Sequence, residues 1–488
     1  MPQISLTESK LFKIWRCLDA LEAIQLKKWL ISPWCNSSAK LIELHDILCV
    51  YYPHFNSDGL NRVAIYQRLF PKRQLDTKLL ATLMSLLTKK IEEFLVHQHL
   101  KQDMATQQEV LMKVYRNKGM RDQCMVKNKK RADTILAKKT RSWQDLLELS
   151  QLYEERYRLS DSRNKALHAS ESDLLKASQY SNLAYIWRKY RLLLELSERE
   201  KILGIDYALD QQLNSLPREA VEHMPVLQLY QEFLKNRNKT NIAHFENLKN
   251  LWLQQRQYID QQDQSILLFY LINIGARIHL QGVKSILSQL LTLYKIGVHE
   301  NLLTEGNQMT VRTFANIVTT ANLEGDFYFV RTLISKHSHT LPMAIQADAV
   351  TWAKTHLAFN SKDAQLWKSS LKLQQIGSIK NTFTIRTRVL LIQMWLEDFF
   401  SKKEQDGSFM LYFCDAFSLQ LKRSKLYGPK RLAAIRIFIK YSRTLIRFKM
   451  RNRLEKDKLM KLRAEILAVP EMQAKQWLLE QIGKKLGE

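Results

Sequence analysis

The stretch from Phe314 to Pro342, FANIVTTANLEGDFYFVRTLISKHSHTLP, decides the fold class of this chain. Apolar residues follow Phe314 at three, four and seven positions, which is the period of one buried helix face. Gly325 then marks a turn, because glycine ends regular helices readily. A second set of apolar residues at helical spacing follows, formed by Phe327, Val330 and Ile334. The stretch therefore predicts two antiparallel helices joined by a short turn.

The same spacing fits the tetratricopeptide (TPR) hairpin through a whole repeat. Val318 stands where that pattern usually has Gly, and Val330 where it usually has Ala, so we expect looser helix packing there. A weaker copy follows 36 residues on, with a turn at Ser361 and Leu366 as a packing residue. These copies predict an all-α protein of stacked antiparallel helical hairpins, forming a TPR-like right-handed solenoid with a small N-terminal helical unit.

The composition excludes a large β-sheet. Thirteen glycines and nine prolines make up under 5% of the 488 residues, and a sheet protein of this size needs many turns built on such residues. Hydrophobic residues make up 45% of the chain, enough for sizeable cores. We therefore expect helices throughout.

Helix-forming patterns divide the chain into three parts. Residues 1–105 contain short helices, the first running from an N-cap at Thr7 to Leu30, and a later one beginning after Asp76. Residues 106–141 are basic and poor in apolar residues, which predicts a polar helix or a connecting segment. Residues 142–488 contain longer helices and the hairpin described above. The expected domains are thus an N-terminal helical domain, a basic connecting segment and a TPR-like repeat domain.

The positive charge is concentrated in two windows. The formal net charge is +27, from 75 basic and 48 acidic residues. The window Lys113–Arg141 holds eleven basic and two acidic residues, and the window Lys422–Arg463 holds sixteen and two. Their net charges of +9 and +14 account for most of the excess. Local basicity of this kind is typical of a surface that binds an anionic partner.

Five cations of the second window share one helical stripe, and we call them the basic ridge: Arg436, Lys440, Arg443, Arg447 and Arg451. Their spacing of three or four residues predicts an exposed ridge, with Phe438, Tyr441, Leu445 and Phe448 facing a core. Like charges at this spacing repel each other. They are therefore offset either by acids on a neighbouring helix or by an anionic partner, and a membrane-surface helix is a third interpretation.

The first window has no such stripe. Its candidate anion-binding residues are Arg121, Lys127, Lys129, Lys130 and Arg131.

The chain resembles large uncharacterised helical proteins of bacteria that are known only as hypothetical or TPR-like. The residues that carry this resemblance are Leu30–Pro33 with Asn36, Leu69–Pro71, Leu291–Tyr294 with Gly297, Phe314–Val318 and Leu421–Arg423. The resemblance implies a helical-repeat fold and no particular activity.

No pattern in the sequence predicts catalysis, a cofactor or a metal. The five cysteines include no C-x-x-C pair, and the close pairs His337/His339 and His97/His99 are two residues apart, so on a helix they point to different faces. Motifs for nucleotide binding, zinc proteases and nucleophilic serines are missing.

We see neither a secretory signal nor a membrane span, and we expect a cytoplasmic protein. The function we expect is a helical-repeat scaffold that binds another protein without catalysis. The alternative is a nucleic-acid-associated protein that holds phosphates on its basic ridges.

Overall fold

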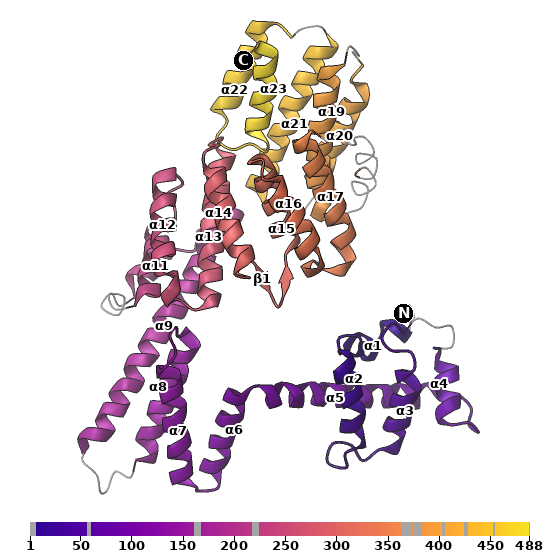
Figure 1. Cartoon of the computed structure of the whole chain (residues 1–488), viewed down its shortest axis with the longest axis vertical. Helices are drawn as coiled ribbons and strands as arrows, with labels where there is room; N and C mark the ends of the chain where they lie inside the picture. The colour runs from indigo at the N-terminus through magenta and orange to yellow at the C-terminus, as the bar shows by residue number, and fades with distance from the viewer. Residues whose placement is uncertain are drawn as a thin grey trace. The chain divides into compact units, whose positions relative to one another are not determined.

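The protein is described by a computed structural model that covers residues 6–55, 60–160, 167–216, 224–362, 382–402, 406–423, 428–451 and 454–487, with Leu373. These residues are almost entirely helical (Figure 1), which confirms the all-α prediction. The chain divides into two compact units, one up to Thr134 and one from Ile135 onward.

The first unit is built from short helices around one long helix. Its elements are η1 (Leu6–Glu8), α1 (Lys10–Trp15), α2 (Ala20–Ile31), α3 (Ala39–Cys49), α4 (Arg62–Leu69), α5 (Thr77–Gln102), α6 (Met104–Asn117) and α7 (Arg121–Leu136), which crosses into the second unit. The 106–141 segment is therefore mainly helical.

The second unit continues with helices and one minimal β-hairpin. Its elements are α8 (Trp143–Leu159), α9 (Leu167–Leu203), α10 (Leu209–Asn214), α11 (Pro225–Lys235), α12 (Ile242–Gln255), η3 (Arg256–Tyr258), α13 (Gln261–Leu280), α14 (Ile286–His299), β1 (Thr304–Glu305), β2 (Gln308–Met309), α15 (Val311–Leu323), α16 (Phe327–His337), η4 (Ser338–Thr340), α17 (Met343–Ser361), α19 (Thr382–Ser401), α20 (Ser408–Arg423), α21 (Pro429–Met450), α22 (Lys456–Ala468) and α23 (Lys475–Leu486).

One core holds α1 to α5 of the first unit together. Phe12, Trp15 and Phe55 are fully buried in it, and α1, α2 and α3 pack against α5. The prediction of a single helix from Thr7 to Leu30 is wrong, because a new helix begins at Asp19. The Asp19 carboxylate accepts from the Glu22 backbone N–H, and the Glu22 carboxylate accepts from the Asp19 N–H. This reciprocal capping box satisfies two N–H groups at the start of α2.

The predicted start of α5 is confirmed. Asp76 is its N-cap, and its carboxylate accepts from the backbone N–H groups of Lys78 and Leu79. A local signal of this kind needs no tertiary contact, since the cap and the groups it satisfies lie within one turn.

The helical hairpin predicted around Gly325 is also present. Helices α15 and α16 are joined through Gly325, whose φ of +76° places it in the left-handed region that glycine adopts without steric cost. Phe314 and Val330, one from each helix, are fully buried. Of the weaker copy, Ser361 is the last residue of α17, and Leu366 lies outside the described residues.

The only strands in the described part of the chain are β1 and β2, which pair antiparallel over two residues each. Gly306 and Asn307 connect them, both with positive φ. That conformation matches the two-residue turn that suits the twist of paired strands.

Candidate interaction surface

Helices α20 and α21 position the basic ridge. The two helices run antiparallel, because Asp415 of α20 contacts Arg443 of α21 while Leu421, later in α20, contacts Arg436, earlier in α21. Phe438 and Leu445 are buried on the inner side of α21, as predicted. Phe448 is only half-buried. The ridge cations therefore lie along the outer side of α21, next to α20.

Two ridge residues are engaged with α20. The guanidinium of Arg443 forms an ion pair with Asp415 at 2.9 Å, and the guanidinium of Arg436 donates to the carbonyl oxygen of Leu421 at 3.3 Å. Asp415 is half-exposed, so the ion pair adds little stability. These contacts hold part of the ridge in place.

The other three ridge residues carry exposed and uncompensated charge. Lys440, Arg447 and Arg451 are exposed, and none of them forms an ion pair with a carboxylate among the residues that the structure describes. The Lys440 ammonium lies 5.2 Å from the ring centroid of Tyr441. Arg447 and Arg451 lie at the C-terminal end of α21, where the helix dipole favours cations. That effect falls off within one turn, so it does not extend to Lys440.

Exposed apolar side chains stand beside these cations on α20. Tyr412 is 75% exposed and Leu419 is 49% exposed. They are three residues before and four residues after Asp415, so all three share one face of α20. Because Asp415 contacts Arg443, this face adjoins the ridge. We call Tyr412, Leu419, Lys440, Arg443, Arg447 and Arg451 together the α20–α21 surface.

The sequence analysis missed Tyr412 and Leu419. Helix α20 is apolar on two sides, with Cys414 and Phe417 buried on the other side. Apolar residues on two sides of one helix indicate that one side stays exposed. Only the tertiary packing shows which of the two sides faces the core.

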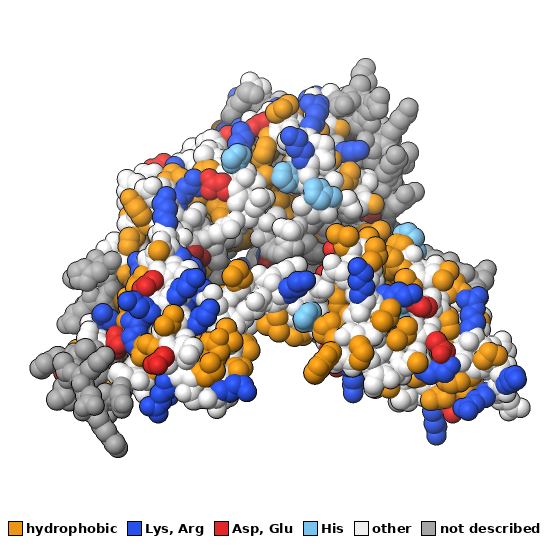
Figure 2. All heavy atoms as spheres, turned by 60° about the horizontal axis from the view of Figure 1, so that its bottom comes forward, with side chains coloured by type: hydrophobic (Ala, Val, Ile, Leu, Met, Phe, Trp, Pro, Cys, Tyr) orange, Lys and Arg blue, Asp and Glu red, His pale blue; other side chains and the backbone are white. Residues whose placement is uncertain are grey.

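The candidate residues of the first window lie on α7. Arg121, Lys129 and Lys130 are exposed, and Lys127 and Arg131 are half-buried. The helix buries a narrow stripe at helical spacing that consists of Cys124, Asn128, Ala132 and Ile135. The segment is therefore folded as a helix with one packed side, and of the five candidates only Lys129 and Lys130 lie away from that side. On the molecular face shown in Figure 2, Lys and Arg side chains outnumber Asp and Glu, with hydrophobic side chains between them.

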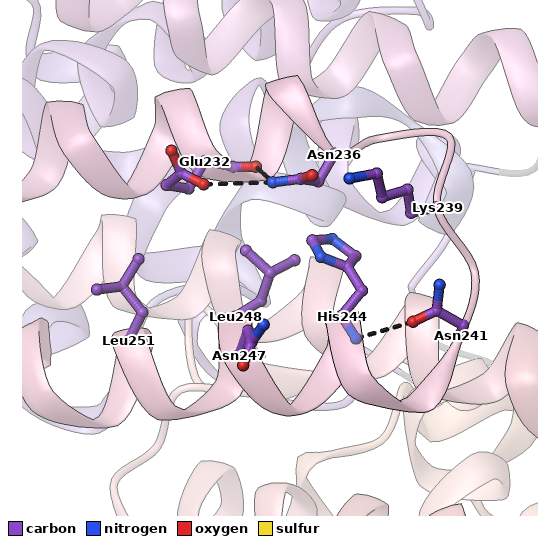
Figure 3. Close-up of a pocket in the computed structure, with 8 residues that line it drawn as sticks. All are labelled: Glu232, Asn236, Lys239, Asn241, His244, Asn247, Leu248 and Leu251. Carbon is purple, nitrogen blue, oxygen red and sulfur yellow. Dashed lines mark hydrogen bonds between the residues drawn. The ribbon is translucent and has the colours of Figure 1, made fainter.

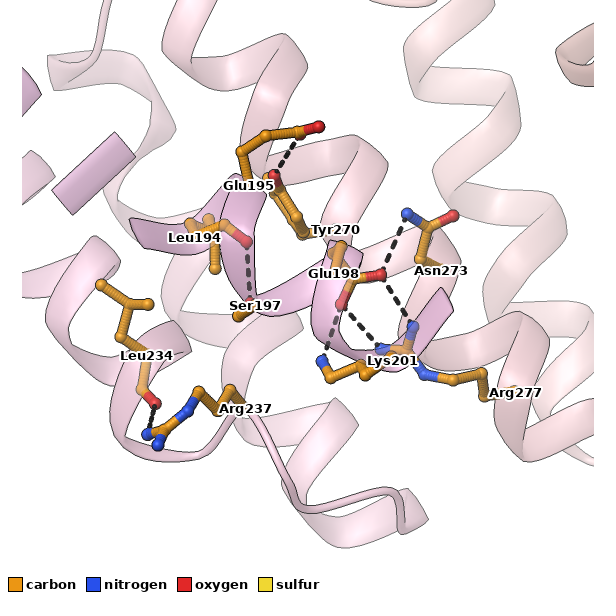
Figure 4. A network of polar contacts seen from close by, with 10 residues as sticks. All are labelled: Leu194, Glu195, Ser197, Glu198, Lys201, Leu234, Arg237, Tyr270, Asn273 and Arg277. Atoms are coloured by element: carbon orange, nitrogen blue, oxygen red, sulfur yellow. Dashed lines mark hydrogen bonds and ion pairs between the residues drawn. The ribbon is translucent and has the colours of Figure 1, made fainter. Parts of the chain in front are cut away.

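A buried charge cluster links α9 to α13 (Figure 4). Glu198 is 8% exposed and forms ion pairs with Arg277 at 2.8 Å and Lys201 at 2.7 Å. Burial acts to raise the pKa of Glu198, but the neighbouring charges of Arg277 and Lys201 outweigh it and hold the pKa below its ordinary value. The Tyr270 hydroxyl donates to Glu195 at 2.9 Å in the same region. Because each of these charged groups already has a partner, the cluster is a structural connection between α9 and α13.

A small polar pocket of about 290 Å³ lies between α11 and α12 (Figure 3). Its Glu232 carboxylate is already engaged, since it pairs with Lys235 at 3.2 Å and accepts from the Asn236 amide at 3.3 Å. His244 points into the space between the two helices, and burial followed by the charge of Lys239 lowers its pKa. The acidic and basic groups balance, so this pocket has less net charge to attract a ligand than the α20–α21 surface.

Within the described ranges, no group of three or more His, Cys, Asp or Glu side chains could hold a metal ion. The five cysteines form no disulfide, and Cys124 and Cys414 are buried. No described helix is both long and apolar enough to cross a membrane.

Neither models of protein families, nor curated protein sequences, nor solved structures show a significant match to this chain.

Proposed function

We propose that the protein is a non-catalytic helical-repeat scaffold that binds an acidic segment of another protein through the α20–α21 surface. The observation that carries this proposal is the juxtaposition of exposed Tyr412 and Leu419 with three exposed cations that form no ion pair with the described residues. We further propose a TPR-like arrangement of the helical hairpins, because repeats of this kind leave extended surfaces for binding.

The charge favours an acidic partner. Lys440 to Arg451 spans about 16 Å at the rise of an α-helix, which matches three turns of a bound helix. Carboxylates spaced one turn apart would then meet successive cations. Complementary charges of this kind speed association and fix register.

The apolar side chains favour an amphipathic partner. Tyr412 and Leu419 lie two helical turns apart on α20, so apolar residues at i and i+7 of a bound helix match them. Tyrosine is among the residues enriched at the hot spots of protein–protein interfaces. Such a partner buries the exposed apolar area, and its carboxylates neutralise the ridge.

The test is a titration of the full chain against a fluorescent helical peptide with leucines on one face and glutamates beside them. The matched control peptide has the same composition in scrambled order. We expect the amphipathic peptide to bind at least about tenfold more tightly, since only its helix presents both groups together. Equal binding of both peptides would contradict the proposal.

Charge reversal locates the binding site. The double variant Lys440→Glu, Arg447→Glu removes two exposed cations that make no ion pair with the described residues. The single variant Lys461→Glu reverses an exposed charge on α22 and serves as the control. We expect the double variant to lose the peptide-binding site on the α20–α21 surface, seen as one fewer peptide bound per chain at saturation, and the control to keep it. Loss of binding in neither variant would place the partner elsewhere.

A second candidate function is binding of single-stranded nucleic acid, favoured by the exposed aromatic ring of Tyr412 next to the ridge. Four phosphate contacts on a single strand predict an affinity loss of roughly 50-fold between about 50 and 200 mM salt. A single-stranded DNA that outcompetes the peptide and shows this salt dependence would favour the second function. A peptide that binds while DNA does not would favour the first.

A further inference from the structure

The first unit contains a groove of about 590 Å³ along one face of α5. Its lining runs from Thr77 to Glu92, a length of about 22 Å along the helix. The residues before and at the start of α1 form another part of its wall. This volume lies in the range of ligand-binding sites.

The floor of the groove is mainly apolar. Leu80 is buried and Met84 is half-buried, while Ala81 and Ser85 are small residues on the exposed side. The hydroxyl of Thr88 is already satisfied, because it donates to the Met84 carbonyl oxygen at 2.8 Å. Small side chains allow another helix to approach closely.

The rim of the groove is positively charged. Arg62, Lys78 and Lys89 are exposed, and none of them forms an ion pair with a carboxylate in the described part of the chain. The groove's one acid, Glu92, is compensated by Lys10 at 2.6 Å. Among the described residues, the rim therefore carries three positive charges without an acidic partner around an apolar floor.

We propose that this groove is a second, independent docking site, which takes an acidic amphipathic helix of a partner protein. The apolar stripe of that helix lies on Ala81 and Met84, next to the buried Leu80. Its flanking carboxylates meet Arg62, Lys78 and Lys89. The groove lies wholly within the first unit and shares no residue with the α20–α21 surface. A chain with both sites bridges two acidic segments, and linking them raises the avidity for a partner that carries both.

The experiment uses the full chain carrying Lys440→Glu and Arg447→Glu, so that the α20–α21 surface cannot capture the probe. The probe is the fluorescent leucine–glutamate helical peptide, followed by anisotropy. We expect this chain to retain saturable binding of one peptide. Complete loss of binding in this background overturns the groove proposal and leaves the proposed function of the α20–α21 surface standing.

Two variants in the same background locate the remaining binding. Arg62→Glu with Lys78→Glu reverses two rim charges, and both residues lie in the first turn of their helices, where acids are favourable, so the fold is preserved. We expect at least about a tenfold loss of affinity. The control Lys101→Glu reverses an exposed charge on α5 outside the groove and leaves the affinity unchanged.

A steric variant tests the groove without changing its charge. Ala81→Trp fills the groove floor without altering charge, whereas Leu86→Trp places the same side chain on another exposed part of α5. We expect only Ala81→Trp to abolish binding. Equal binding by both tryptophan variants overturns the proposal, as does a single-stranded DNA probe that binds the groove with the same variant dependence in place of the peptide.

Discussion

The hydroxyl of Tyr230 donates a hydrogen bond to Oδ1 of Asp263, and both side chains are buried. Tyr230 lies on α11 and Asp263 in the first turn of α13, so the bond joins two helices through a carboxyl group removed from water. The other carboxyl oxygen, Oδ2, has no hydrogen-bond partner, nor has Oδ2 of the N-cap residue Asp260. Burial and the neighbouring Asp260 raise the pKa of Asp263 to about 7, against the opposing effects of Tyr230 and Arg191.

The raised pKa predicts that Asp263 destabilises the fold at neutral and alkaline pH relative to acidic pH. A carboxyl whose folded pKa exceeds its unfolded value favours folding while it is protonated. Its contribution therefore falls as pH rises from about 4 to about 7 and is constant above that range. The shift corresponds to a few kcal/mol, on the order of 4.

Asp263→Asn tests this directly. We expect the variant to match the wild type near pH 4 and to be more stable at pH 8, measured by urea unfolding at both pH values. Tyr230→Phe is the matched variant, because it removes a donor that favours the ionised carboxylate. It should raise the pKa of Asp263 further and extend the loss of stability to higher pH. Identical pH profiles of the wild type and Asp263→Asn would contradict the buried, protonated state.

The Glu198 cluster predicts a large loss of stability when its acid is removed. Glu198→Ala leaves Arg277 and Lys201 partly buried without a counter-charge, and we expect about 3–5 kcal/mol of destabilisation. Arg158→Ala breaks the exposed ion pair with Glu154 and should cost less than about 1 kcal/mol. Chemical unfolding of both variants checks the contrast, and similar losses would argue against the buried cluster.

The close packing around Gly297 leaves no room for a side chain at the end of α14. A Cβ there would lie 2.6 Å from Cγ of Leu303 and 2.9 Å from Cδ2 of Leu268. Gly297→Ala should therefore destabilise by about 1–3 kcal/mol through overpacking, although alanine favours helices. Adding Leu303→Ala should cost less in this background than in the wild type, since it relieves the contact. Simple additivity of the two losses, measured by thermal unfolding, would rule out the clash.

Removing the charge of Asp415 should strengthen the binding of the acidic peptide to the α20–α21 surface. Asp415→Asn releases Arg443 from its ion pair and removes a negative charge near Tyr412. We expect a few-fold tighter binding of the acidic peptide and a stability change under about 1 kcal/mol, because the pair is partly exposed. Weaker binding of the peptide would show that Asp415 holds Arg443 in the orientation that the partner needs.

Local signals in the sequence located several helices of this protein. Periodicity located α15 and α16, glycine located their turn, and the Asp76 carboxylate located the start of α5, because each depends on residues within a few positions of one another. The prediction of one helix from Thr7 to Leu30 was wrong because the apolar period continues through Asp19, where a second helix begins. The stripe of ridge cations on α21 likewise follows from helical spacing alone.

Only the tertiary structure decided which charges are compensated and which apolar faces remain exposed. Arg443 meets Asp415 from another helix, Asp263 is buried beneath Tyr230, and Tyr412 faces outward while Phe417 faces the core. Each outcome depends on contacts between residues tens of positions apart or on which helix face is covered. Burial and ion pairing are properties of packed neighbours, and helical periodicity does not specify those neighbours.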